Sequence, residues 1–534
     1  MQVVVQENLH INLQTAAQII QIIKGRLQVL QKIAIAEVVP LIVHPAAAVR
    51  PPLVDHPAAL VVLLQVALEV QVVLEQEIKK YAMKKIILFS FILSALLAKA
   101  QSISYADAAV LFSTDDNYGT ARFVGMGGAF GALGGDLTAA DINPAGLAVF
   151  NNTEFSTTLS YRNTQNKTSF YGPSISNEDD YFKFSQVGAV LVFDTFNASG
   201  FNKFTLGFNY NVIKDFNNNY LVEGNSGIAD FNNDPYLNYD DNPFNDIYYE
   251  NVENQYFQNY MSGINDRFTF NFASQYEDLL YLGASMSFQH LDFYQNTIYE
   301  EFNNDGNGNL LNGYTSQYLT NYGNGFNFGF GAILKPISNL RLGLAYQSPI
   351  WYNISERFIE NIEIEVSNNP NLYTEYYDPN YFDYSLKTPS KLTSSVAYVF
   401  GKSGLISFDY IYQDFKNTRL SPSSAFIDDN QDLAKGLKNT SSFKIGAEWR
   451  YEIFSFRGGY RMIESPYAKV DSSFDITGYS LGLGIQFNRI VKLDFAYDNS
   501  SFSDQYSFLN IDGVNPANID INNDRFTTTF TISF

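Results

Sequence analysis

The last segment of the chain constrains the fold more than any other feature of the sequence. Between Asp524 and Phe534, every second position carries an apolar side chain or threonine, and the positions between them carry threonine or serine. The first set comprises Phe526, Thr528, Phe530, Ile532 and Phe534, and the second comprises Thr527, Thr529, Thr531 and Ser533. A period of two is typical of a β-strand with one apolar and one polar face. Such strands occur in soluble β-sandwiches and in barrels that span a membrane.

The spacing of strand-length segments favours the barrel. About fourteen such segments follow Thr153, and the connections between them alternate strictly between long and short. Short connections are expected near Ala198, Glu277, Pro336, Gly401, Glu452 and Arg489, and long ones near 164–183, 215–264, 301–322, 367–388, 417–438, 464–473 and 504–521. Outer-membrane barrels have short periplasmic turns and long outer loops. We therefore predict an all-β fold over residues 153–534, a transmembrane antiparallel barrel of about fourteen strands in the bacterial outer membrane.

A secretory leader precedes this region. Residues 83–100 combine two lysines, a short apolar run and the small-residue site Ala98-Lys99-Ala100, which is the pattern of a cleaved signal peptide. The apolar run is too short to span a membrane as a helix. A signal peptide acts at an N-terminus, so we interpret residues 1–82 as an upstream extension that results from a start site assigned too early. A genuine cytoplasmic extension is the alternative.

Residues 101–152 differ from the strands that follow. They are rich in glycine and alanine, show no period of two, and begin with a predicted short helix at Tyr105–Phe112. A segment this small cannot bury a core of its own, so we expect it to fill the bore of the barrel as a hatch. The residues that indicate a compact hatch are Gly125, Gly127, Gly128, Asn143, Pro144 and Ala145. The last three also fit an ordinary turn, because proline fixes its own φ and restrains the residue before it.

Charge and residue content exclude several classes of function. The formal net charge is −21, which argues against a nucleic-acid partner because such a partner requires a basic face. The acidic residues cluster in predicted outer loops, where they are either solvated or in contact with divalent cations. The absence of cysteine excludes disulfides and thiolate chemistry. The aromatic content of 16% fits the girdles of a membrane barrel.

Charged side chains are predicted to face the lumen in the later strands. They are Arg341, Lys444, Glu448, Arg450, Arg457, Arg461, Lys492 and Asp494. Charges are costly on the lipid face of a barrel and tolerated inside it. Two interpretations remain open: an ion-pair network that holds hatch and wall together, or a path for a solute.

Enzymatic interpretations have little support. His290 is the only histidine after residue 100, and its strand pattern places it on the outer face, away from any triad of nucleophile, base and acid. The glycine run at 125–131 misses the dinucleotide-binding spacing and has no strand–helix unit around it. Asp305–Asn309 resembles the start of a calcium loop but lacks the later ligands, so a plain Asn/Gly loop is the alternative. We expect no catalysis, no cofactor and no metal.

Several stretches occur in an order that points to one family. They are Asn143-Pro144-Ala145 within the glycine-rich segment, and residues 339–350, 388–392, 443–451 and 456–461. Together they resemble the FadL-type long-chain fatty acid and hydrocarbon transporters of the outer membrane, over the range Gln101 to Phe534. The resemblance implies a fourteen-stranded barrel with an N-terminal hatch, which agrees with the strand count above.

The resemblance also implies passive uptake of hydrophobic molecules. A ligand would be captured among outer loops and pass to an apolar pocket beside the hatch. It would leave after the hatch rearranges, and one possible exit is a gap in the barrel wall. The capturing loops would be 301–322 and 367–388, with candidate contacts Leu310, Leu311, Leu372, Tyr373, Tyr376 and Tyr377. The expected partners are a hydrophobic small molecule and outer-membrane lipid with lipopolysaccharide, around a monomer. A general porin and a surface adhesin remain alternatives, and a continuous aqueous bore would favour the porin.

Overall fold

A computed structural model describes residues 103–195, 200–237, 247–509 and 511–534. The predicted leader, the extension before it and the turn near Ala198 lie outside the described residues. Within the described ranges, no helix has both the length and the apolar character needed to cross a bilayer.

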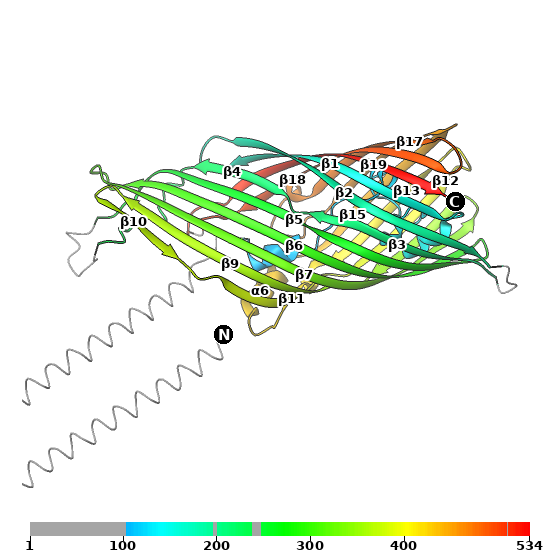
Figure 1. Ribbon diagram of the computed structural model, residues 1–534, viewed down its shortest axis with the longest axis horizontal. Coiled ribbons are helices and arrows are strands. Elements are labelled where there is room, and N and C mark those ends of the chain that lie inside the picture. The colour runs from blue at the N-terminus through cyan, green and yellow to red at the C-terminus, as the bar shows by residue number, and fades with distance from the viewer. Residues whose placement is uncertain (1–102, 196–199, 238–246, 510) are drawn as a thin grey trace, which may run out of the picture. The chain divides into compact units, whose positions relative to one another are not determined.

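The described strands form one antiparallel sheet that closes on itself (Figure 1). Closure comes from β1, which pairs with β2 on one side and with β19 on the other. The strands are β1 Glu154–Ser169, β2 Ile175–Asp194, β3 Phe201–Asp215, β4 Asn218–Gly224, β5 Asn251–Tyr276, β6 Leu280–Asn304, β7 Leu310–Ile337, β8 Leu340–Gln347, β9 Trp351–Val366, β10 Asn369–Tyr376, β11 Asn380–Lys387, β12 Lys391–Val399, β13 Gly404–Asp414, β14 Arg419–Ser421, β15 Asn439–Tyr451, β16 Phe454–Ile463, β17 Ile476–Gln486, β18 Val491–Tyr506 and β19 Ala517–Ser533.

Some of these labels are parts of one interrupted barrel strand. Both β3 and β4 pair with β5, and both β8 and β9 pair with β7. In the same way β10, β11 and β12 follow one another along a single wall position, as do β13 and β14. Counted by wall position, the described barrel has fourteen strands, which confirms the predicted number.

The two faces of the wall carry the predicted chemistry. In β19 the side chains of Phe526 and Phe530 are 53% and 38% exposed, whereas Thr527 and Thr529 are buried. The same outward exposure of Phe, Leu and Tyr recurs around the whole barrel. A polar interior with an apolar exterior is stable only where hydrocarbon surrounds the wall, so the closed sheet is a membrane-spanning barrel.

The two ends of the barrel differ, and one group of predicted loops was wrong. The short turns at 277–279, 338–339, 400–403, 452–453 and 487–490 lie at one end, here called the short-turn end. At the opposite loop end, the predicted connections 164–183, 301–322 and 367–388 are mostly strand. Residues 170–174, 305–309 and 367–368 connect neighbouring wall strands there, and residues 377–379 separate β10 from β11. Beyond the membrane the outward face need not be apolar, and these strand ends mix polar and apolar side chains on both faces, so the period of two that identified the other strands is lost.

The N-terminal segment, residues 103–150 and here called the plug, lies inside the barrel (Figure 1). Its helices are α3 Tyr105–Leu111, α4 Ala121–Val124, α5 Ala139–Ile142 and the 3-10 helix η2 Pro144–Val149. The predicted helix at the start of the segment is confirmed as α3. At the loop end, three short helices follow later strands: η3 Phe415–Asn417, α6 Ile427–Gly436 and η4 Ser472–Phe474.

Glycines in the wall let the plug backbone approach it closely. A Cβ at Gly343 would lie 2.5 Å from the Gly131 carbonyl oxygen, and one at Gly459 would lie 2.2 Å from the Gly127 nitrogen, below the 3.0 Å that real Cβ contacts keep. Gly283 of β6 meets the plug backbone in the same way. A side chain at any of these positions would push the plug off its seat.

Candidate functional site

An ionic network joins plug and wall near the short-turn end. Glu448, which is 3% exposed, bonds to Arg122 of the plug at 3.0 Å and to Arg457 at 2.7 Å. Arg457 continues to Asp494, also at 2.7 Å. Each buried charge here has an opposite charge and further hydrogen bonds, as low-dielectric surroundings require. The arrangement fits the network interpretation of the lumen charges.

The other predicted lumen charges fall into two groups. Arg450 and Lys492 extend the network through Glu448 and Asp494, and the Arg341 guanidinium donates to a plug carbonyl. Arg461 and Lys444 instead face a cavity. Sequence position alone could not separate these groups, because both occupy inward positions of the same strands.

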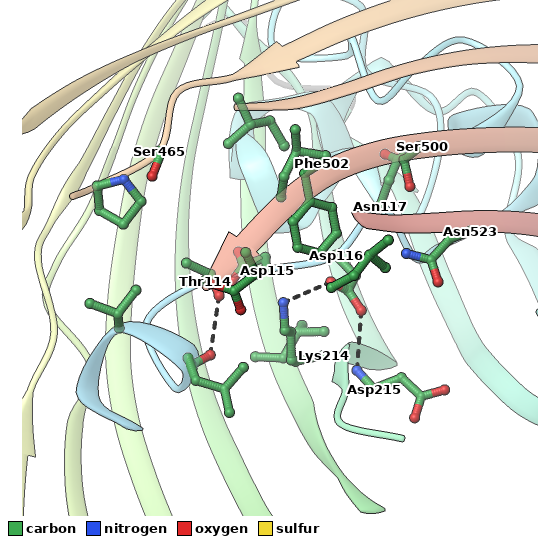
Figure 2. A pocket seen from close by; sticks show the side chains of 18 of the residues that line it. Thr114, Asp115, Asp116, Asn117, Lys214, Asp215, Ser465, Ser500, Phe502 and Asn523 are labelled. Carbon is green, nitrogen blue, oxygen red and sulfur yellow. Dashed lines mark hydrogen bonds and ion pairs between the residues drawn. The ribbon is translucent and has the colours of Figure 1, made fainter. Parts of the chain in front are cut away.

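The cavity lies between the plug and the loop-end half of the wall. Its volume is about 580 Å³, within the range of small-molecule sites. Apolar side chains form much of its lining, among them Ile103, Leu111, Phe216, Phe415, Ile463, Phe474, Phe502 and Ile519. Figure 2 shows its polar part, where Asp116 of the plug lies between Lys214 and the backbone of Asp215. The cavity is therefore amphipathic.

Most cations that line the cavity are already paired. Lys214 bonds to Asp116 at 3.0 Å, and Arg267 bonds to Asp141 at 3.1 Å. Further pairs join Lys391 to Asp115 and Arg461 to Asp498, and the Arg525 guanidinium lies 3.8 Å from the centre of the Tyr118 ring. Paired cations hold the plug in place and have little capacity left for a ligand.

Lys444 is different from these cations. Among the described residues it forms no ion pair and no hydrogen bond, and its ammonium lies 6.0 Å from the centre of the Phe123 ring. An ammonium has three donors, and Lys444 is one of the residues that line the cavity. Lys444 is thus a positive charge that remains available to a ligand.

The wall is interrupted beside the cavity. The ladder between β2 and β3 ends at the pair Gln186 and Asn211, and no ladder joins β2 to β4 in the described residues. The chain bends into the bore at Phe216–Asn217. Side chains of β1 then hydrogen-bond to carbonyls of the displaced segment: Arg162 to Asn217 at 2.5 Å, Asn166 to Asn219 at 2.7 Å, and Thr168 to Leu221 at 2.6 Å. We call this interruption the wall gap.

Charged side chains occupy the wall gap. Asp215, whose side chain is fully buried, accepts a bond from Lys183 at 2.7 Å and contacts Arg162 at 3.5 Å. The Tyr118 hydroxyl of the plug donates to the same carboxylate at 3.1 Å. Asp215 and Arg162 also line the cavity. The gap and cavity are therefore separated by side chains alone, and no pattern in the sequence marked this place.

The loop residues that the sequence singled out lie elsewhere. Leu311 and Tyr373 belong to an apolar cluster with Tyr249, Ile364 and Val366. Leu310, Leu372, Tyr376 and Tyr377 are 42%, 51%, 65% and 43% exposed. None of the six is among the residues that line the cavity, so their part in ligand capture stays a prediction.

The predicted hatch residues hold the plug against the wall. Asn143 donates to the Gly131 carbonyl at 2.7 Å and to the Ala332 carbonyl of β7 at 3.2 Å, and it accepts from the Ala145 nitrogen. Gly127 and Gly128 adopt φ of +63° and +76°, which glycine tolerates best. The tripeptide at 143–145 is thus a turn that bridges to the wall.

Candidate metal sites find little support in the geometry. The Asp305 carboxylate accepts bonds from the backbone of Asn307 and Asn309 in its own loop. His290 faces outward and is exposed. Across the described ranges, no three His, Asp or Glu side chains gather in a way that could hold a metal ion.

One acidic group at the loop end has a displaced pKa. Partial desolvation by the surrounding loops, and then the charge of Glu301, raise the pKa of Asp230 to about 6. Glu301 itself is buried and accepts bonds from the backbone nitrogens of Asp230 and Phe231. This cluster joins the loop after β4 to β6.

A closed barrel with an apolar exterior, an internal plug and a cavity beside the plug defines a plugged outer-membrane β-barrel. Comparison with known proteins refines this class. No protein-family model and no curated protein matches the sequence. Among solved structures, a Pseudomonas aeruginosa FadL homologue is similar, with a TM-score of 0.51 and 15% identity over 79% of this chain and 100% of that chain.

Two further structures resemble the chain. The Pseudomonas putida toluene transporter TodX matches with a TM-score of 0.49 and 13% identity, over 79% of this chain and 100% of its own. The Ralstonia pickettii toluene transporter TbuX matches with a TM-score of 0.47 and 16% identity, over 78% and 99%. On the evidence of the FadL homologue, the chain has the FadL-type fold, as the resemblance in sequence implied.

Proposed function

We propose that this protein takes up hydrophobic small molecules passively across the outer membrane, and that its ligands are long-chain fatty acids or similar apolar compounds. The observation that carries the proposal is the amphipathic cavity between plug and wall. A long apolar chain with one acidic group matches a lining that combines apolar side chains, ion-paired charges and Lys444, whose ammonium forms no ion pair among the described residues. The similarity to a FadL homologue supports the same class.

In this proposal Lys444 binds the acidic group of the ligand. Its ammonium forms no ion pair or hydrogen bond among the described residues, whereas neighbouring cations are neutralised by the plug. Charge-assisted hydrogen bonds are about twice as strong as neutral ones. The alkyl part of the ligand would then lie against the apolar side, near Phe216 and Phe502.

The wall gap gives this ligand a route out of the cavity. The short-turn end is filled by plug residues that are fully buried, such as Met126, Phe130 and Leu147. A hydrophobic molecule that leaves through the gap enters the membrane directly and avoids the aqueous side. Passage requires the Lys183–Asp215 pair to separate. A filled bore also argues against the alternative of a general porin.

Uptake by cells tests the proposal. Labelled oleate and an uncharged aromatic compound are supplied to cells that produce the protein, its Lys444→Met variant, or Lys402→Met, which changes an exposed turn lysine. We expect Lys444→Met to reduce oleate uptake about tenfold, the loss of a charged hydrogen bond, and to leave the aromatic compound unaffected. Uptake of both compounds that does not depend on the protein would disprove transport.

A second experiment tests the route. The chain contains no cysteine, so cysteines introduced at Tyr181 and Asn219, whose side-chain tips meet across the gap at 3.2 Å, can be bridged selectively by a bifunctional methanethiosulfonate reagent. We expect the bridge to stop uptake and its cleavage by a reductant to restore uptake. Uptake that continues with the bridge in place would exclude the gap as the route.

A further inference from the structure

The outer face of the barrel carries a second cavity that has no part in the proposed transport. It lies at the loop end, across the outward faces of β18, β19 and β1, between η4 on one side and the end of β2 on the other. Its volume is about 710 Å³, again within the range of small-molecule sites. We call it the outer groove.

Most of the residues that line the outer groove have polar side chains, and Phe502 and Ile521 are the apolar ones. Hydroxyl groups come from Ser176, Ser501 and Ser503, and amides come from Gln165 and Asn522. Charge is present as Glu178, Asp475 and Asp520 against the single cation Lys167. Hydroxyls, amides and carboxylates together supply both hydrogen-bond donors and hydrogen-bond acceptors. This combination recognises polyhydroxylated ligands.

Several of these groups are free to bind. The Lys167 ammonium and the Ser176 hydroxyl form no hydrogen bond or ion pair in the described part of the chain. The Asp520 carboxylate accepts only from Ser503, at 2.7 Å. Polar atoms arranged around a hollow, with bonding capacity left over, favour a ligand that supplies both donors and acceptors.

The height of the groove identifies the source of such a ligand. Below it, Tyr497 and Tyr161 pack against Phe526, with ring centres 5.1 and 6.3 Å apart, in an aromatic girdle. Ser501 lies four residues beyond Tyr497, or about 13 Å along the strand at about 3.3 Å per residue, and about 10 Å along the membrane normal after tilting by about 40°. The polar headgroup layer is about 5–8 Å thick on each side. The groove therefore begins at its outer edge, where the sugars of outer-leaflet glycolipids lie.

We propose that the outer groove binds the saccharide part of an outer-leaflet glycolipid. Three carboxylates against one ammonium make the groove net negative, so phosphate groups are disfavoured and neutral, hydroxyl-rich sugars are favoured. Carboxylates accept hydrogen bonds from adjacent sugar hydroxyls, and Lys167 donates to sugar oxygens. The glycolipid is held by its headgroup, beside the barrel and outside the path through the bore.

Binding measurements on the purified, folded barrel test this proposal. The probes are lipopolysaccharide from a rough strain, its lipid-free core oligosaccharide, the same oligosaccharide after dephosphorylation, and lipid A alone. Ser501→Trp fills the groove from its exposed floor, and Ser262→Trp is the matched control, because Ser262 is an exposed, outward-facing serine of β5 away from the groove. Gln165→Ala combined with Ser176→Ala provides a milder variant if the tryptophan prevents folding.

The proposal predicts a distinct pattern across the probes. Whole lipopolysaccharide and both forms of the oligosaccharide bind, and Ser501→Trp weakens each of them about tenfold, as expected when one or two hydrogen bonds are lost. Ser262→Trp leaves binding unchanged. Lipid A that binds as tightly as whole lipopolysaccharide, binding that disappears on dephosphorylation, or binding that is insensitive to both groove variants would overturn it.

Discussion

The two halves of the bore hold the same plug in different ways. At the short-turn end, plug backbone lies directly against wall glycines, and its amides donate to wall side chains, as Phe130 and Gly131 do to Asp409 at 2.9 Å. At the loop end, α3 packs by its side chains into an apolar cluster that includes Phe293 and Leu319, and hydrogen bonds join Tyr105 to Glu356 at 2.6 Å and Tyr467 to Asp107 at 2.8 Å. The cavity lies in this second half.

This difference between the two halves suggests that the short-turn half blocks the bore and the loop-end half binds the ligand. Where the plug backbone packs directly against the wall backbone, the plug cannot shift, because protein interiors are close-packed and do not deform smoothly. Side chains around a cavity can change rotamer at small cost. We therefore expect the half at the short-turn end to stay in place while the loop-end half responds to a ligand. The following predictions test that division, from the largest expected effect to the smallest.

Removing the plug should change conductance most. Deleting Tyr105–Phe150 takes away the residues that fill the bore, so we expect single-channel conductance in planar bilayers to rise from a closed level to that of an open, water-filled barrel. Deleting only α3, Tyr105–Leu111, should leave the channel closed, because the short-turn half remains seated. Open channels after the smaller deletion would show that both halves close the bore.

Breaking the ionic network should lower stability strongly. Glu448→Ala leaves the guanidinium groups of Arg122 and Arg457 buried without their shared partner. Removing one member of a buried ion pair costs about 3–5 kcal/mol, and urea unfolding followed by the loss of heat-modifiable migration measures it. Asp512→Ala, in an exposed loop, should change the free energy of unfolding by less than about 0.5 kcal/mol. Equal effects of the two variants would contradict the proposed network.

Two adjacent glycines of β16 provide a matched test of the contact between plug and wall. A side chain at Gly459 would meet the plug backbone at 2.2 Å, whereas at Gly458 the nearest atom lies 4.0 Å away. Overpacking costs about 1–3 kcal/mol, so Gly459→Val should destabilise the barrel by this amount and Gly458→Val should not. If both substitutions are tolerated, the plug is not fixed at this wall.

The smallest effect concerns pH at the loop end. The pKa of Asp230 is raised to about 6 in the folded protein, so the folded loop binds a proton more tightly than the unfolded chain does. Its contribution to stability is complete below about pH 4 and is lost as the pH rises through about 6. Amide hydrogen exchange of residues 225–237 should therefore be faster at pH 7.5 than at pH 5, beyond the intrinsic change. Asp230→Asn should remove the difference, and the effect is small because the side chain keeps contact with solvent.

Much of the fold could be read from the sequence because it depends on local patterns. The alternation around Phe526 predicted the wall and its two faces, and the absence of alternation before Thr153 predicted a separate segment. The same logic failed for residues 301–322, where strands leave the membrane and mix polar and apolar side chains on both faces. The loop residues Leu311 and Tyr373 were selected by position in a loop, yet the structure packs them into a cluster away from the cavity.

The site depended on partners that are far apart in the chain. Arg122 and Glu448 are 326 positions apart, and no local pattern relates them. Both were visible as charges, but only the fold shows that Glu448 is shared by several arginines, while Lys444, four residues earlier, forms no ion pair with any described residue. The wall gap is likewise invisible in the sequence, because it results from where a ladder ends and not from an unusual residue.

The sequence by itself determined that this chain forms a barrel with an apolar exterior, about fourteen strands and a distinct N-terminal segment, because solvent and lipid act on every residue of a strand locally. Tertiary structure alone decided which charges neutralise one another, where a cavity remains and where the wall opens. These outcomes arise from distances between segments that become neighbours only when the sheet closes, since ion pairing and packing act over a few ångströms in space, whatever the separation along the chain.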